Sequence, residues 1–357
     1  MTSDDSRYTT LRRALGIIAP FLLTGVFLYL SFYNVNLLET MDVISNASVL
    51  FIGVYLVFFM LSHIVRAVRW KVMISSSRPH ASVVNLFAAT MIGYGVNLVV
   101  PRLGELYRSF FGGRWENLSR TSMLGTVIVE RVIDIIVLGI SVLVSAIIYS
   151  GDLYVEVTWL ESAVILGFIA MGIVVILLAL LIIFKDVFIN ISVKILSKIS
   201  EKLAQKINYV LSMLVDGFSS LKGYKNYLIT ISLSALIMIL YAFTGWLGFY
   251  VLHLNEVYNT TFSMAWVVMT VSAFGIVLPT PGGTGTYHFI AISTLVNLYG
   301  FTEELASAYA LYNHTTASLV FVILTVVMIN YVNWRRKKQG LSKENFFSVI
   351  KSNKGAE

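Results

Sequence analysis

Cysteine is absent from this 357-residue chain, which excludes disulfides, thiol catalysis and cysteine-ligated metal sites. Charged residues are also scarce, at 13% of the sequence, whereas 57% of the residues are hydrophobic and the mean hydropathy is +0.80. Soluble domains contain roughly 45–50% apolar and about 25% charged residues. Several apolar runs reach about 20 residues, the length at which a helix crosses a hydrocarbon core about 30 Å thick. These properties predict an all-α integral membrane protein.

Neither a cleavable signal peptide nor a nucleic-acid interface is evident in the sequence. The first apolar run, residues 14–33, is followed by Asn34 and Asn36 rather than by a small-residue cleavage site, which indicates a permanent span. The net charge is +7, but the basic residues lie at the ends of apolar segments. In such positions they orient helices and contact anionic headgroups. We therefore expect membrane lipids as partners, and no nucleic acid.

The distribution of lysine and arginine predicts the topology. Both residue types are absent from residues 14–65, 132–184 and 226–333, whereas basic residues cluster near the N-terminus and in the run 335–338. By the positive-inside rule, both termini lie in the cytoplasm. We expect a multi-pass protein of the cytoplasmic (plasma) membrane of a prokaryote.

Six segments are predicted to cross the membrane completely, and two are not. The complete spans are expected at about residues 14–33, 47–66, 121–149, 162–184, 227–252 and 306–332. The apolar stretch 82–100 has basic residues on both sides, so we expect a re-entrant hairpin that enters from the cytoplasm. The stretch 261–298 has only acidic flanks, so its hairpin should enter from the other side.

A shift of 180 positions relates the two halves of the chain. It aligns four residues in and just after the first hairpin with identical residues of the second half, and it places Arg108 opposite His288. The identical pairs are Gly95 and Gly275, Leu98 and Leu278, Pro101 and Pro281, and Tyr107 and Tyr287. Such a shift favours an inverted repeat with discontinuous helices, as in many secondary transporters, although so few matches also arise by chance.

The repeat defines the expected domain organisation. A single transmembrane domain, residues 1–335, contains the halves 14–149 and 162–332, and a cytoplasmic tail follows at 336–357. The insert 185–226 is rich in lysine and has apolar residues at helical spacing. We interpret the insert as an amphipathic helix on anionic lipid, with a partner-binding helix as the alternative.

Polar residues at the first break suggest a headgroup site. Asn97 lies in the break itself, and Arg102, Glu105 and Arg108 follow it. Guanidinium groups match phosphate oxygens in two-point geometry, so the two arginines could bind a lipid phosphate, with Glu105 orienting one of them. The alternative is a basic interfacial loop that contacts bulk headgroups.

The third span contains Glu130, Arg131 and Asp134, about 14 Å along the helix from Thr121. Charges at such depth are costly and usually functional, and we assign these three residues to gating or coupling. The alternative is structural pairing with the arginines that end the second span. Those residues, Arg66, Arg69 and Trp70, are interpreted as interfacial anchors.

Prolines and glycines in residues 279–288 prevent a regular helix at the second break. Freed amides and hydroxyls at the start of the returning helix could bind an anion. The candidate binding residues are Thr280, Gly282, Gly283, Thr284, Gly285 and His288. A tight turn without a ligand is the alternative. His314, in the last span, is a candidate for proton or headgroup coupling, or else a packing residue.

Four motifs, in order, carry a family resemblance: Arg66 to Trp70, Gly95 to Arg108, Glu130 to Asp134, and Pro279 to Gly285. Together they resemble the lysylphosphatidylglycerol synthase transmembrane-region family, which is also called flippase-like. The resemblance implies a flippase that moves a phosphate-bearing lipid between leaflets: a phospholipid, an aminoacylated phospholipid or a polyprenyl-phosphate glycan. In the family this membrane unit occurs alone or fused to lipid synthases or glycosyltransferases, so the resemblance implies an enzyme of either kind as a candidate partner.

Two other classes of function remain as alternatives. A membrane-embedded lipid-modifying enzyme could use Glu130, Asp134 or His288 as acid or base, and a membrane scaffold could support a separate synthase or glycosyltransferase. The sequence has no GxSxG or HExxH signature and no soluble synthase domain. We therefore expect a transporter rather than an enzyme, with no catalytic residues, no metal and no cofactor.

Overall fold

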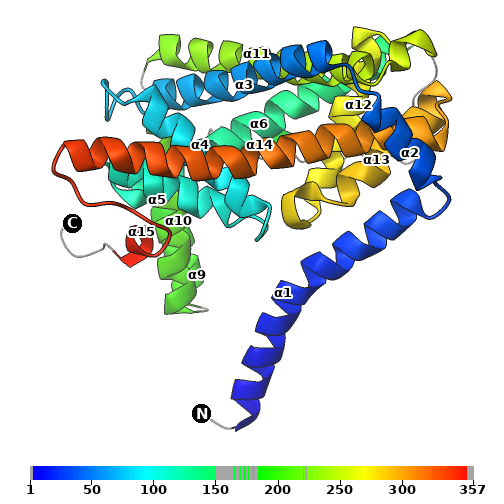
Figure 1. The fold of residues 1–357 in the computed structure, drawn as a ribbon. Helices are drawn as coiled ribbons and strands as arrows, with labels where there is room; N and C mark the ends of the chain where they lie inside the picture. Colours follow the sequence, from blue (N-terminus) through cyan, green and yellow to red (C-terminus); the bar gives the residue numbers. More distant parts are fainter. Residues whose placement is uncertain are drawn as a thin grey trace. The chain divides into compact units, whose positions relative to one another are not determined.

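The computed structural model describes residues 3–149, 184–198, 200–219, 221 and 223–351, with a few residues between 165 and 180. In this part of the chain, helices and turns alternate without a strand, which confirms the all-α class (Figure 1).

Four helices in the described part of the chain are long and apolar enough to cross a membrane: α3 (Val49–Met73), α6 (Arg120–Ile148), α11 (Tyr224–Val251) and α14 (Glu303–Lys338). A fifth candidate is the bent pair α1 (Ser3–Phe32) and α2 (Leu37–Ser45), whose axes differ by 87°. These five coincide with predicted spans. The remaining predicted span, 162–184, lies outside the described residues apart from isolated positions, so the count of six stays a prediction.

The break between α1 and α2 has a local cause. The side-chain oxygen of Asn36 accepts hydrogen bonds from the amides of Leu38 at 3.2 Å and Glu39 at 3.4 Å. An asparagine in this position caps the start of a new helix and satisfies amides that lack an intrahelical partner. The chain therefore restarts as α2 instead of continuing α1.

Two pairs of shorter helices flank the predicted breaks. The first pair is α4 (Val83–Asn97) and α5 (Gly104–Glu116), and the second is α12 (Phe262–Ser272) and α13 (Thr286–Tyr299), with short 3-10 turns at Ala273–Val277 and Pro281–Gly283. Both halves thus have the order long, short, short, long helix. The repeat requires this order, while the re-entrant and inverted arrangement remains a prediction.

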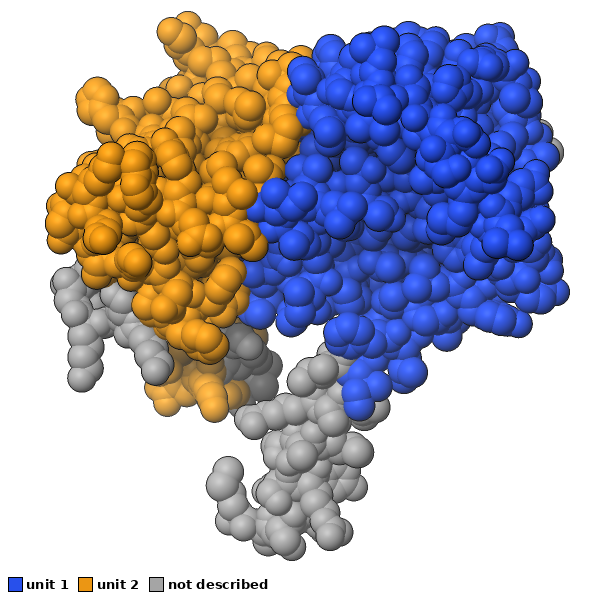
Figure 2. Space-filling model, in the orientation of Figure 1, with its two compact units in different colours: residues 1–59, 94–104, 241–323 blue, residues 60–93, 105–240, 324–357 orange. Residues whose placement is uncertain are grey.

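The chain divides into two compact units, each built from both halves of the sequence (Figure 2). Unit 1 contains residues 1–59, 94–104 and 241–323, and unit 2 contains residues 60–93, 105–240 and 324–357. The predicted repeat halves therefore do not coincide with the compact units.

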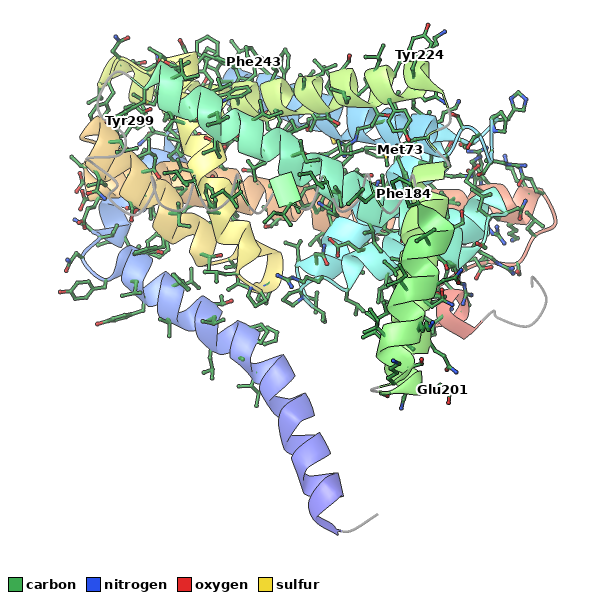
Figure 3. All side chains as sticks on the ribbon, turned by 180° about the vertical axis from the view of Figure 1, so that it is seen from behind. Met73, Phe184, Glu201, Tyr224, Phe243 and Tyr299 are labelled. Carbon is green, nitrogen blue, oxygen red and sulfur yellow. The ribbon has the colours of Figure 1, made fainter. Side chains whose placement is uncertain are left out.

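The insert between the halves forms two helices of unit 2, α9 (Lys185–Ser197) and α10 (Glu201–Ser219). Figure 3 labels the residue before α9, Phe184, and the first residue of α10, Glu201. Helix α10 packs closely against α6, because a Cβ atom added at Gly217 would lie 2.6 Å from the backbone of Gly125. The expected helical character of the insert is thus observed, and its position on lipid stays a prediction.

Candidate functional site

Three helices of unit 2 bring five charged side chains together. Helix α3 contributes Arg66 and Arg69, α5 contributes Arg108, and α6 contributes Glu130 and Asp134. We call these five residues the arginine cluster. Residues three or four apart on a helix share a face, so each pair within α3 and α6 points in one direction.

Glu130 lies at the centre of the arginine cluster and is fully buried. Arg108 binds its carboxylate at two points, with Nη1 2.9 Å from Oε1 and Nη2 2.7 Å from Oε2. Arg66 Nη1 lies 2.7 Å from Oε1, and Arg69 Nη2 lies 3.1 Å from the same oxygen. One carboxylate thus contacts three guanidinium groups.

Asp134 joins the same network one turn further along α6. Its Oδ1 lies 2.7 Å from Arg69 Nη1, and its Oδ2 lies 2.9 Å from Arg66 Nη1. The pairing with Arg66 and Arg69 that the sequence offered as an alternative is therefore present for both acids. This pairing does not exclude a functional role, because buried ion pairs are weak contributors to stability unless geometry and hydrogen bonding are good.

The end of α3 carries Arg66, Arg69 and Trp70, for which the sequence favoured interfacial anchoring. All three side chains are buried. Arg69 Nη1 donates to Ser234 Oγ at 2.7 Å, and the Trp70 ring lies 4.0 Å beneath the Arg108 guanidinium. Trp70 Nε1 also donates to Thr126 Oγ1 at 3.0 Å. Ser234 and Thr126 also contact the site, and the sequence gave no signal to find them, since each is one of several hydroxyl residues in its helix.

A more exposed edge borders the arginine cluster. Asp134 is 13% exposed, Glu105 26% and Arg131 38%. Arg131 Nη2 lies 3.5 Å from Glu105 Oε1, and Arg131 Nη1 lies 3.7 Å from Asp134 Oδ2. The carboxylate that binds Arg108 at two points is Glu130, 22 positions away, and the orienting role expected of Glu105 stays a prediction. We expect ligands to reach the cluster from this edge.

The charges of this assembly do not balance. The arginine cluster has three positive and two negative side chains, and Arg131 and Glu105 add one of each sign. Counted over these seven described side chains, the formal charges add up to +1. Because charge interactions are stronger in a low-dielectric interior than in water, this surplus favours an additional anion.

The second predicted site lies in unit 1 and is a tightly bonded loop. The hydroxyls of Thr280 and Thr286 lie 3.0 Å apart, and Thr286 Oγ1 donates to Gly283 O at 3.1 Å. The amides of Gly283 and Thr284 donate to the carbonyls of Thr280 and Pro281 at 3.1 and 3.0 Å. These two amides are engaged inside the loop, which favours the tight-turn interpretation over an anion site at these positions.

The same loop meets the break between α4 and α5 within unit 1. A Cβ atom added at Gly282, where φ is +61°, would lie 2.6 Å from Leu98 Cδ2. Asn97 Oδ1 accepts from the Gly104 amide at 2.7 Å and so closes the turn between the two helices. Arg102, in that turn, is exposed and has a φ of 64°. The two predicted breaks thus contact each other through Leu98 and Gly282.

Two histidines border this loop, and backbone contacts fix their protonated nitrogens. The Gly285 amide donates to His288 Nδ1 at 3.2 Å, so this nitrogen is an acceptor. His314 Nε2 lies 3.1 Å from Gly282 O, and because a carbonyl only accepts, Nε2 carries the proton. The centroids of the two imidazole rings are 4.7 Å apart. The structure therefore brings His288 and His314, separate candidates in the sequence, into one pair.

A sequence profile for the lysylphosphatidylglycerol synthase TM region matches residues 17–326. The chain belongs to this family. The matched region contains both the arginine cluster and the loop with its histidine pair. No curated protein and no solved structure matches the chain. Membership in the synthase TM-region family identifies a multi-pass membrane protein linked to lipid synthesis or translocation.

Within this family member, His288 has a structural task that mutation can test. At the third position of α13 it accepts the Gly285 amide, the task that glutamine or glutamate performs in a capping box. We expect His288→Ala to lower the free energy of unfolding by about 0.5–2 kcal/mol, because the amide loses its acceptor. His288→Gln should retain most of that stability.

Thermal unfolding in detergent micelles measures this difference between the two His288 variants. His253→Ala serves as the control, because the His253 side chain is exposed and pairs only locally with Glu256 at 2.8 Å. Equal melting temperatures for the alanine and glutamine variants of His288 would show that the capping contact contributes nothing.

Proposed function

We propose that this protein is a lipid flippase that moves a phosphate-bearing lipid between the leaflets of the membrane. The observation that supports the proposal is the arginine cluster, in which three buried guanidinium groups face two carboxylates. The substrate class comprises phospholipids, aminoacylated phospholipids and polyprenyl-phosphate glycans, which share the phosphate.

The geometry at Arg108 supports phosphate as the recognised group. Arg108 already binds Glu130 with two parallel N–H···O contacts, of 2.9 and 2.7 Å. Phosphate oxygens accept the same fork of donors. A lipid phosphate would therefore compete with the carboxylates for the guanidinium groups, and the surplus positive charge would favour its binding. When the headgroup leaves, Glu130 and Asp134 would form their ion pairs with the arginines again, so that the buried charges stay paired.

The surroundings of the cluster fit a ligand that is polar at one end and apolar at the other. Arg131 and Glu105 form the exposed charged edge, through which a headgroup would first make contact. On the same helix, Ile135 is 62% exposed directly after Asp134, and Ile140 is also exposed. Helix α6 thus presents an apolar surface beside the charged edge, where acyl chains could remain in lipid while the headgroup binds.

The position of the protein in the cell belongs to the same proposal. The basic residues near both chain ends favour cytoplasmic termini. As part of the proposal, we place the protein in the plasma membrane of a prokaryote. A separate lipid synthase or glycosyltransferase would supply the lipid or consume it after transfer. Arg102, exposed in the turn after α4 in unit 1, is a candidate headgroup contact of its own.

Lipid analysis of whole cells distinguishes a flippase from the alternatives. Total lipids would be compared by mass spectrometry, and leaflet distribution by a membrane-impermeant amine or glycan label, in cells with and without the protein. We expect an unchanged inventory of lipids and an altered leaflet distribution, and Asp134→Asn should abolish the alteration. A covalently changed lipid would contradict the proposal and favour an enzyme. A partner enzyme whose activity depends on the protein but not on Asp134 would favour a scaffold.

A further inference from the structure

Residues 339–351, which follow α14, fold back against unit 2. The sequence assigned residues 336–357 to a cytoplasmic tail, but α14 continues to Lys338 and the chain then turns back at Gly340, where φ is +72°. Figure 1 shows this return and the short helix α15 (Ser348–Lys351) at its end. Glu344 and Val349 are buried. We call residues 341–351 the C-terminal clamp.

Glu344 fastens the clamp to two helices. Its Oε1 lies 2.7 Å from Arg114 Nε, at the end of α5, and 3.4 Å from Arg336 Nη2, at the end of α14. Its amide donates to Asn333 Oδ1 at 2.9 Å, and Asn333 Nδ2 donates to Glu344 O at 2.7 Å. Ser348 Oγ completes the set with a 2.8 Å bond to Oε2. A single residue thus ties the last turns of α5 and α14 together.

The charge of Glu344 persists at neutral pH. Burial alone would raise the pKa of this carboxyl, but hydrogen bonds from Arg114 and Ser348 and the charges of Arg114 and Arg336 hold the pKa below its ordinary value. A carboxyl whose pKa is lower in the folded state stabilises the fold above its ordinary pKa and loses this contribution as the pH falls through the folded value. The clamp is therefore fastened at neutral pH and weakened in acid.

Phe346 packs against the part of α5 that contains Arg108. Its ring meets Tyr107 edge to face at 5.4 Å between centroids, and Phe111 at 5.7 Å. Tyr107 directly precedes Arg108, and the fully buried Phe111 follows three residues later. Arg120, at the start of α6, also donates to Ile350 O at 3.1 Å. The clamp therefore contacts both helices whose side chains form the Arg108–Glu130 contact.

We infer that the C-terminal clamp holds α5 in the position in which Arg108 grips Glu130, with Glu344 and Phe346 as positioning residues for the headgroup site. The inference rests on the proposed function. A two-point contact between guanidinium and carboxylate requires fixed orientation of both groups, and a displacement of about 1 Å at such a site can cost about 100-fold in rate. Loss of the clamp lets α5 shift, which impairs the site without removing any of its charges.

Transport in sealed proteoliposomes gives the first arm of the test, with a labelled phospholipid as the probe. Phe346→Ala and Glu344→Gln are expected to slow transfer by about tenfold or more, because Arg108 loses its orientation. Phe347→Ala is the matched control, since the neighbouring ring is 76% exposed, and its transfer rate should equal that of the wild type. Phe346→Leu, which keeps an apolar side chain, should recover part of the rate.

A second arm measures the position of α5 without transport. Because the chain has no cysteine, Ser109→Cys introduces a single thiol next to Arg108, at a fully buried position of α5. We expect slow reaction of this thiol with a maleimide when the clamp is intact. Adding Phe346→Ala or Glu344→Gln should raise the reaction rate by about tenfold or more, since burial protects a thiol only while the helix stays packed. Adding Phe347→Ala should not change it.

The two arms separate the clamp from the proposed function. Slower transport together with a more reactive thiol supports the inference. A more reactive thiol with unchanged transport would overturn it, since the clamp would then hold α5 without positioning the site, and so would an unreactive thiol in both clamp variants. A wild-type protein that moves no lipid would refute the proposed function instead, and the thiol would still decide whether the clamp holds α5.

Discussion

Glu130→Ala is expected to lower the free energy of unfolding by about 3–5 kcal/mol, because it removes one side of a buried ion-pair network. Glu130 is fully buried and contacts Arg66, Arg69 and Arg108 at 2.7–3.1 Å. Without its carboxylate, Arg108 would lose its two-point partner, and Asp134 would remain beside Arg66 and Arg69. Domains are stable by only about 5–15 kcal/mol, so the variant should fold poorly.

The Glu130 prediction is measured by titrating the purified protein in mixed micelles with a denaturing detergent. Glu105→Gln is the control, because this carboxylate lies at the exposed edge of the cluster and should change stability by less than about 1 kcal/mol. The double change of Glu130→Gln with Arg108→Gln should be milder than Glu130→Ala, since it removes both partners of the two-point contact. A Glu130→Ala protein as stable as the control would contradict the assigned burial of this network.

Arg108→Lys is expected to slow lipid transfer by about 10- to 100-fold, although the charge is kept. Lysine replaces a planar fork of donors by one ammonium group, so the two-point contact with a carboxylate or phosphate cannot form. A hydrogen bond to a charged group contributes about 1.5–3 kcal/mol, which corresponds to this range of rates. The indole of Trp70, 4.0 Å from the guanidinium, fits a flat cation and adds to the preference for arginine.

Transfer rates in proteoliposomes, normalised to the amount of folded protein, measure the Arg108 effect. Arg78→Lys is the matched control, because Arg78 belongs to the same unit, its side chain is 45% exposed, and its Nε lies 3.9 Å from Glu116 Oε2. The control should transport at the wild-type rate. If Arg108→Lys also transports at that rate, the site needs positive charge alone and the two-point recognition of phosphate is wrong.

The sequence predicted the long helices, and it predicted which two acidic residues of α6 lie on the same face of that helix. Long apolar runs define helices because lipid leaves the backbone no other hydrogen-bond partners. Glu130 and Asp134, four residues apart, were expected to share a helix face, and both indeed contact Arg66 and Arg69. Helical periodicity alone supports these two steps, since it fixes the direction of side chains within one helix.

The partners across helices were much harder to predict. The grip of Arg108 on Glu130 and the burial of Trp70 depend on how far α5 and α3 are shifted along α6, and periodicity within one helix contains no information on that shift. The sequence therefore gave no indication that Trp70 packs beneath Arg108. The loop of unit 1 shows the same limit, because its glycines predicted free amides while the Gly283 amide bonds within the loop.

The C-terminal clamp also escaped prediction from the sequence. Its anchors, Glu344 and Phe346, lie in a short segment that is too brief to span a membrane and follows a run of basic residues, so the segment resembled a tail. Their contacts, with Arg114 and Phe111, lie more than 200 positions earlier in the chain. Only the folded arrangement of unit 2 brings these residues together.

The most direct test of the proposed function is the rate at which a labelled phospholipid or polyprenyl phosphate crosses the bilayer of sealed proteoliposomes. A phosphate-free glycolipid with matched acyl chains is the comparison lipid, and protein-free vesicles give the background. We predict that the wild-type protein accelerates transfer of a phosphate-bearing lipid but not of the glycolipid, and that Arg108→Lys removes most of the acceleration. Background rates for every phosphate-bearing lipid, or equal acceleration of the glycolipid, would contradict a flippase that recognises phosphate through the arginine cluster.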